Sequence, residues 1–278
     1  MKKISFLLLA ILISVTSCKK TNNPPAAAST DYNPGVGWTQ SWSEEFNDAS
    51  LNTSIWNYDL GNNNGWGNNE LEYYLAQNVQ LSNGNLEITA KRENQSGFSF
   101  TSGRINTQNK YAFKYGKIVA KMKLPQGYGI WPAFWMLGST IATQPWPSCG
   151  EIDIMEMKGG GGGGDQTIYS TCHWANSSNV HAYYGLSYSY TSSLSEAYHY
   201  YEVEWNATTI TARFDGVQYY QLSITAPEAS ELSNNSYNIV LNLAVGGNFF
   251  IPAINNQANV TATFPQTMYV DWIKIYKQ

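Results

Sequence analysis

Alternation of apolar and polar residues in short stretches constrains the fold of this chain most. In GKIVAKMKLP (116–125), apolar side chains occupy every second position from Ile118 to Leu124. A repeat of two residues is that of a β-strand with one buried face. The pattern predicts a half-buried antiparallel strand. IVLNLAVGG (239–247) repeats it, with Asn242 on the face opposite the apolar residues.

Further strand signals extend over the rest of the chain. Residues 198–222 predict two strands joined by a hairpin turn at Asp215-Gly216, because Asp-Gly tolerates the positive φ angles of such a turn. The C-terminal MYVDWIKIYK (268–277) also reads as a strand, and 10 Trp, 20 Tyr and 10 Phe enrich the chain in strand-favouring aromatics. We expect an all-β fold, a jelly-roll sandwich of two antiparallel sheets, with a concave groove on one sheet.

The N-terminus reads as an export signal. Lys2 and Lys3 precede an apolar run that is shorter than the roughly 20 residues of a membrane-spanning helix. Val15-Thr16-Ser17-Cys18 resembles a bacterial lipobox, so we expect a signal peptide over 1–17, lipidation at Cys18 and a flexible tether over 18–37; an unmodified signal cleaved elsewhere is the alternative. The protein would be an exported, membrane-anchored lipoprotein, periplasmic or at the cell surface, with one catalytic domain over 38–278.

Charge and cysteine content narrow the possible partners. Cleavage of the signal removes two lysines and no acid, so the formal net charge changes from −4 to −6, which argues against a nucleic-acid surface. With Cys18 lipidated, Cys149 and Cys172 remain. In an oxidising compartment they form either a disulfide or two buried thiols, and spacing does not decide between them.

The stretch EIDIMEM (151–157) carries three carboxylates. Hydrolysis of a glycosidic bond uses two carboxyl groups, one to protonate the leaving oxygen and one to attack or support attack at the anomeric carbon. On a regular strand Glu151 and Asp153 share a face and Glu156 points away. A β-bulge near Ile154-Met155 would return Glu156 to that face, and crowding of like charges would keep at least one carboxyl protonated. A solvated acidic edge or a cation site is the plainer interpretation.

Several motifs, in order along the chain, resemble the laminarinase-like branch of glycoside hydrolase family 16, retaining endo-glucanases with a β-jelly roll. They are WSEEFN (42–47), GWGNNELEYY (65–74), SGRINT (102–107), GKIVAKMKLPQGYGIWPAFWMLG (116–138), WPSCGEIDIMEM (146–157), STCHW (170–174), NLAVGG (242–247) and YVDWIKIY (269–276).

The resemblance implies roles for the three acids. Glu151 would be the nucleophile, Glu156 the acid/base, and Asp153 the group that tunes and orients the nucleophile. The inserted Met155 matches the bulged form typical of laminarinases, so the resemblance favours β-1,3-glucan as substrate. Mixed-linkage β-1,3-1,4-glucan and marine galactans remain alternatives.

Other positions match sugar-binding residues of the family. Trp131 and Trp135 match aromatic subsites, and core tryptophans are the alternative; Asn69 and Arg104 match groups that bind hydroxyls. The remaining candidates near the groove are Glu70, Trp146, His173 and Asn242.

No cofactor is expected for catalysis. The histidines have no zinc-protease spacing, and no nucleophilic serine motif of the G-x-S-x-G type occurs. The resemblance does imply a structural calcium at Glu45, the backbone of Gly84, and Asp271, and oxygen ligands of this kind suit a hard cation. The two carboxylates could equally be ordinary surface acids.

Six consecutive glycines, Gly159–Gly164, follow the acids. No Lys-Ser/Thr follows them, so they do not form a phosphate-binding loop. We expect a floppy, passive connection at one edge of the fold, with a lid over the groove as the alternative.

We therefore expect a monomeric retaining endo-β-1,3-glucanase that acts on β-glucan polysaccharide. A glycan-binding lipoprotein without catalytic activity is the rival from another class. The intact pair of Glu151 and Glu156 favours the enzyme, because a binder does not need it.

Overall fold

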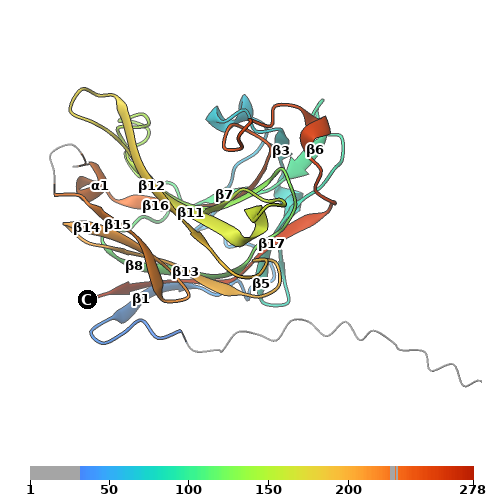
Figure 1. The fold of residues 1–278 in the computed structure, drawn as a ribbon. Helices are drawn as coiled ribbons and strands as arrows, with labels where there is room; N and C mark the ends of the chain where they lie inside the picture. The colour runs from blue at the N-terminus through green and yellow to red at the C-terminus, as the bar shows by residue number, and fades with distance from the viewer. Residues whose placement is uncertain (1–31, 226–228, 230) are drawn as a thin grey trace, which may run out of the picture.

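The structure is a computed structural model that describes residues 32–225, 229 and 231–278. Two antiparallel sheets dominate it (Figure 1), so the expected all-β sandwich is confirmed. The predicted signal peptide, Cys18 and most of the predicted tether lie outside the described residues. In the part of the chain that is described, no helix has the length and apolar character needed to cross a membrane.

The first sheet has eight strands. In spatial order seven of them are β15 (Val217–Ser223), β14 (Thr209–Phe214), β13 (His199–Trp205), β8 (Gly116–Lys123), β17 (Gln266–Lys277), β5 (Asn85–Ala90) and β4 (Val79–Ser82). The eighth, β1 (Thr39–Glu44), also pairs with β17. Residues 199–223 thus form three strands where the sequence predicted two, because a second turn at residues 206–208 precedes the predicted one at Asp215-Gly216.

The second sheet has seven strands and carries the candidate site. Its order is β12 (His181–Ser189), β11 (Thr167–Ala175), β10 (Glu151–Met157), β9 (Ile130–Gly138), β16 (Tyr237–Val245), β7 (Arg104–Asn106) and β2 (Asn57–Tyr58). We call the face of this sheet that is turned away from the first sheet the groove face.

Short elements complete the described chain. A parallel pair joins β3 (Glu72–Tyr74) to β6 (Phe100–Ser102). The helical turns are η1 (Gly65–Gly67), η2 (Ala76–Asn78), η3 (Gly164–Gln166), α1 (Glu231–Asn234) and η5 (Gln257–Asn259).

The core lies between the sheets and follows the predicted alternation. Ile239, Leu241 and Leu243 of β16 belong to it, whereas Asn242 points to the other side of the strand. Burial of such apolar surface supplies most of the folding free energy.

Strand β8 departs from its prediction as a half-buried strand. Val119, on the face away from the core, is fully buried. It packs in a second cluster with Trp272 and Tyr276, against which Tyr32 and Trp38 lie. The aromatic ring of Tyr32, which belongs to the predicted tether, thus covers this outer face of the first sheet.

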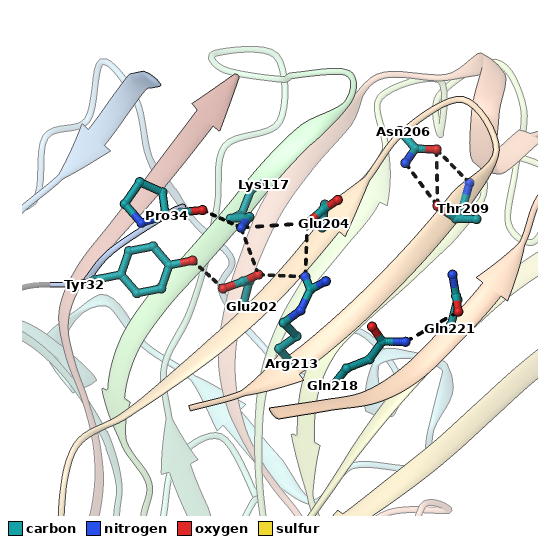
Figure 2. Close-up of polar contacts among 10 residues, drawn as sticks. All are labelled: Tyr32, Pro34, Lys117, Glu202, Glu204, Asn206, Thr209, Arg213, Gln218 and Gln221. Atoms are coloured by element: carbon teal, nitrogen blue, oxygen red, sulfur yellow. Dashed lines mark hydrogen bonds and ion pairs between the residues drawn. The ribbon is translucent and has the colours of Figure 1, made fainter. Parts of the chain in front are cut away.

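A network of opposite charges accompanies this cover (Figure 2). Lys117 Nζ lies 3.4 Å from Glu202 Oε1 and donates to the Pro34 carbonyl at 2.8 Å. Arg213 donates to Glu202 at 3.0 Å and to Glu204 at 3.1 Å, and the Tyr32 hydroxyl donates to the other oxygen of Glu202. Each buried charge has a partner, which is the condition under which burial of charge is tolerated.

Candidate active site

A β-bulge in β10 places the three acids on the groove face. The register to β9 shifts between Asp153 and Met155, and the register to β11 shifts between Asp153 and Glu156. The inserted residue lets Met155 and Met157 enter the core while Glu156 points outward with Asp153. The bulge predicted at Ile154-Met155 is confirmed.

Each acid has a polar neighbour, and Glu151 and Asp153 share theirs. Trp131 Nε1 donates to Glu156 Oε1 at 2.9 Å. His173 Nε2 lies 3.2 Å from Asp153 Oδ2 and 3.8 Å from Glu151 Oε1. Asp153 and Glu156 are only 4% and 9% exposed, so a charge on either carboxyl is poorly solvated.

Burial raises the pKa of all three carboxyls. The pKa of Glu151 is raised to about 8 by desolvation and by the charge of Asp153, although His173, Arg104 and a hydrogen bond from Trp146 oppose the rise. The pKa of Asp153 is raised to about 8, again chiefly by desolvation. Loss of hydration also raises the pKa of Glu156 well above its usual range, and the two neighbouring acids add to the effect. The cluster therefore retains protons at neutral pH.

The β9 side of the acids carries aromatic and cationic groups. Arg104 lies between two indole rings, 4.5 Å from the Trp66 centroid and 5.1 Å from that of Trp135. Its Nε donates to Asp59 at 2.9 Å, which fixes the guanidinium. Trp135 Nε1 donates to Asn242 Oδ1 at 2.7 Å, so its indole is held by a buried amide.

A buried polar chain continues behind Asn242. Its Nδ2 donates to the Tyr74 hydroxyl at 3.3 Å, and that hydroxyl donates to Glu70 at 3.0 Å. Desolvation and the charge of Glu70 raise the pKa of the fully buried Glu72. Glu70 thus contacts the groove residue Asn242 through the Tyr74 hydroxyl. Asn69 is more exposed and donates to Asn248 at 3.1 Å.

Histidines and a tryptophan lie on the β11 side. His173 Nδ1 is 2.9 Å from His181 Nε2, and their rings stack with centroids 5.1 Å apart. The Trp146 ring lies 4.5 Å from that of His181. The structure thus brings His173 and Trp146 to the acids, as the sequence predicted.

Several contacting residues were not found from the sequence. Trp66, Asp59, Tyr74, Glu72 and His181 all touch predicted site residues. Trp66 and Tyr74 fall inside the motif 65–74, so the family resemblance could have indicated that they lie near the site. His181 lay outside every motif, and its position depends on the pairing of β11 with β12.

The implied calcium ligands do not form a free cation site in this arrangement. Glu45 Oε1 lies 3.2 Å from Lys274 Nζ, and Asp271 Oδ2 lies 2.5 Å from Lys121 Nζ. A cation would have to displace both ammonium groups, so these residues do not fit calcium as they stand. Among the described residues, ligand atoms of Glu151, Asp153 and His173 lie within 4.8 Å of one another. They are the groups already placed at the acid cluster.

The two remaining cysteines are free and buried. Burial raises the pKa of the Cys149 thiol to about 11, so its thiolate form is disfavoured at neutral pH. Of the two alternatives left open by the sequence, the structure has separate thiols.

The glycine run is more ordered than expected. Asp165 Oδ1 accepts from Gly160 N and Gly127 N, both at 2.8 Å. A Cβ at Gly159 would lie 2.5 Å from the Gly127 carbonyl oxygen, whereas one at Gly161 would meet nothing within 4 Å. The prediction of a floppy connection is therefore wrong for the start of the run, Gly159 and Gly160, which pack against residues 127–130 at the beginning of β9.

Comparison with known proteins fits this geometry. The family model described as Glycosyl hydrolases family 16 matches residues 67–274. The chain belongs to glycosyl hydrolase family 16.

Relatives of this family 16 chain include longer proteins. It is 38% identical over 242 residues to the clotting factor G alpha subunit of Tachypleus tridentatus, covering 86% of this chain and 34% of that protein. It is 34% identical over 275 residues to glucan endo-1,3-beta-glucosidase A1 of Niallia circulans, covering 90% and 39%. The chain thus spans between a third and two fifths of the length of these relatives.

One solved structure is matched by this chain over almost its whole length. The catalytic domain of an endo-1,3-beta-glucanase (laminarinase) from Thermotoga petrophila matches with a TM-score of 0.76 at 38% identity. The match covers 87% of this chain and 98% of that structure.

Proposed function

We propose that this protein is a retaining endo-β-1,3-glucanase. The observation that carries the proposal is the bulged strand β10, which turns two glutamates to one groove face beside sugar-sized aromatic surfaces. Retaining glycosidases use such a pair as nucleophile and acid/base. The chemistry needs no cofactor, because both proton transfer and attack are carried by carboxyl groups.

In this mechanism Glu156 is the general acid. Burial raises its pKa and so favours its protonated form, and it gives that proton to the glycosidic oxygen as the bond to the anomeric carbon breaks. The indole N–H of Trp131 donates to Glu156 and stabilises the carboxylate that remains after the proton has left. Glu156 then removes a proton from the water that hydrolyses the intermediate.

Glu151 is the nucleophile and forms the covalent glycosyl-enzyme. It must be ionised to attack. Asp153 is more deeply buried than Glu151, so desolvation penalises its anion more, and we place the shared proton of the pair on Asp153. Arg104, His173 and Trp146 all favour the anion of Glu151. Asp153 is thus a positioning residue.

Substrate binding is assigned to the groups around the acids. Trp131 and Trp135 offer ring faces to sugars, and Arg104, Asn69 and Asn242 offer polar groups. Laminarin-type β-1,3-glucan is the preferred substrate because of the bulged acid motif and the named activities of the Niallia and Thermotoga relatives. Mixed-linkage glucan and marine galactan are the alternatives.

A glycan-binding protein without catalysis is the rival, since the Tachypleus relative is a clotting factor subunit. The test is release of reducing ends from laminarin, lichenan, agarose and carrageenan. We expect activity on laminarin, loss of it in Glu151→Gln, and a first-formed product with retained anomeric configuration by proton NMR. Absence of reducing ends from every polymer would support the rival, and an inverted anomer would exclude the covalent intermediate.

We also propose that the chain is exported and anchored through lipid on Cys18, in the periplasm or at the cell surface. We propose that it acts there as a monomer. The lipobox-like Val15–Cys18 and the apolar run before it support this. Metabolic labelling with a palmitate analogue tests it, with Cys18→Ala as control. Labelling that persists in Cys18→Ala would exclude this anchor.

A further inference from the structure

Lys158 directly follows the strand that carries the acids and lies on its groove face. Strand β10 ends at Met157, which enters the core. Because successive side chains of a strand alternate between its faces, Lys158 points to the same side as Glu156, two residues earlier. Glu156 pairs with Tyr169 of β11, so Tyr169 shares that face. A cation at the end of β10 therefore accompanies the acid/base residue.

The ammonium group of Lys158 is held between two aromatic rings. Its Nζ lies 4.2 Å from the Phe249 centroid and 4.6 Å from the Tyr169 centroid. The two rings meet edge to face, with their centroids 5.4 Å apart. A cation over the face of a ring is attracted by the quadrupole of that ring. Neither ring offers a carboxylate, so the rings fix the cation without forming an ion pair with it.

One of these rings also connects Lys158 to the proton donor. Phe249 stacks on Trp131 with centroids 4.8 Å apart, and Trp131 Nε1 donates to Glu156 Oε1 at 2.9 Å. Burial lowers the pKa of Lys158, and the charge of Glu156 opposes this shift. The attraction between the two charges acts on both groups, so the ammonium favours the anion of Glu156.

Other charged groups also face the acid/base carboxyl. Two acids of β10 disfavour its anion and one histidine of β11 favours it; they are Asp153, Glu151 and His173. Beyond the end of β10, the carboxylate of Asp165 accepts two backbone N–H groups. Lysine has a much higher ordinary pKa than histidine. Lys158 therefore supplies positive charge at alkaline pH, where the acid cluster loses its protons.

We propose that Lys158 is a positioning residue that supports Glu156 through its fixed positive charge. The ammonium group stabilises the carboxylate that is left when Glu156 gives its proton to the glycosidic oxygen. It thereby makes Glu156 a stronger acid and sets the upper pH limit of activity. The Phe249 and Tyr169 rings keep the ammonium group in place. The inference rests on the proposed glucanase function.

The test is the pH dependence of kcat/KM on laminarin, whose alkaline limb reports loss of a proton from the acid cluster of the free enzyme. In Lys158→Met, a neutral side chain of similar length packs between the rings. We expect the alkaline limb to move up by about 0.5–1 pH unit, the size expected for one partly screened charge. Lys158→Gln should move it in the same direction. Lys158→Arg keeps the charge and should keep the wild-type limb.

Lys123→Met is the matched control. Lys123 Nζ also lies over two rings, 4.5 Å from the Tyr269 centroid and 5.8 Å from that of Tyr198. Its strand, β8, belongs to the first sheet, so its loss should leave the limb in place.

Three results would overturn the role of the charge. They are a limb that stays in place in both neutral variants of Lys158, an equal movement in Lys158→Arg or Lys123→Met, and a loss of kcat/KM by the same factor at every pH. The last is what a purely structural role produces. If wild-type protein cleaves no β-1,3-glucan at any pH, the proposed function itself fails, which is a separate result.

Discussion

Two buried clusters of charge, one on each sheet, are organised in opposite ways. On the outer face of the first sheet, Lys117 and Arg213 alternate with Glu202 and Glu204, and each charge meets an opposite one. On the groove face, Glu151, Asp153 and Glu156 crowd together, and His173, Lys158 and the more distant Arg104 offset their charge in part. The first arrangement favours ionised groups, and the second favours retained protons.

The difference shows how the same residue type can serve structure or chemistry. A buried glutamate with two cationic partners is a structural element, whose removal takes away the buried counter-charge of those cations. A buried glutamate among other acids is destabilised in its charged form, and this is the state that proton transfer requires. Substitutions of matching chemistry on the two sheets should therefore have separate consequences.

The largest expected effect is on turnover, from Glu156→Gln. Removal of a general acid should lower kcat on laminarin by roughly 10²–10⁴-fold. An aryl β-glucoside substrate with an acidic phenol as leaving group needs no protonation, so its glycosylation step should be slowed far less. Glu151→Gln should abolish both. Steady-state and pre-steady-state kinetics check this, and an equal loss on the two substrates would contradict the role of Glu156.

The next effect is on stability, from Glu202→Gln. Lys117 and Arg213 would lose their shared, buried carboxylate. We expect the free energy of unfolding to fall by about 3 kcal/mol, while kcat on laminarin stays within about twofold. Denaturant titration and the laminarin assay measure the two. A variant that unfolds like wild type would show that the network contributes little.

A smaller effect depends on pH. The folded-state pKa values of Glu151 and Asp153 are both raised to about 8, above the values of about 4.3 and about 3.9 in an unfolded chain. The folded pair therefore binds more protons than the unfolded chain between these values, whichever carboxyl carries the shared proton, and the stability that this binding contributes is lost as pH rises through that window. Glu151→Gln should gain melting temperature over wild type as pH rises from 4 to 9. A difference that is flat or shrinks with pH would contradict the raised pKa.

The smallest effect concerns the glycine run. Gly160 has φ of +135° and a Cβ there would meet Tyr128 at 2.9 Å, whereas Gly161 has open space around it. Gly160→Ala should lower the free energy of unfolding by about 1–2 kcal/mol, and Gly161→Ala should leave it unchanged. Chemical denaturation of both variants tests whether only part of the run is packed. If the two variants are equally stable, the result would support the floppy connection expected from the sequence.

Much of this could be predicted from local sequence, because alternation and motifs are local. The two-residue repeat gave the strands, and the extra residue in EIDIMEM gave the bulge that turns Glu156 outward. Contacts between distant segments left no such trace. Tyr32 covers Val119 of β8, and His181 meets His173 only because β12 pairs with β11. In the sequence, neither the predicted tether that contains Tyr32 nor the isolated His181 indicates these partners.

The packing of Tyr32 fixes the side of the domain at which the described chain begins. Its ring contacts Tyr200, Trp272 and Tyr276 on the outer face of the first sheet, and the acids open on the outer face of the second. The chain therefore enters the domain from the back of the sandwich. With the proposed lipid at Cys18, the membrane and the polysaccharide would approach from opposite sides, so a long glucan could be cut without first being drawn under the protein.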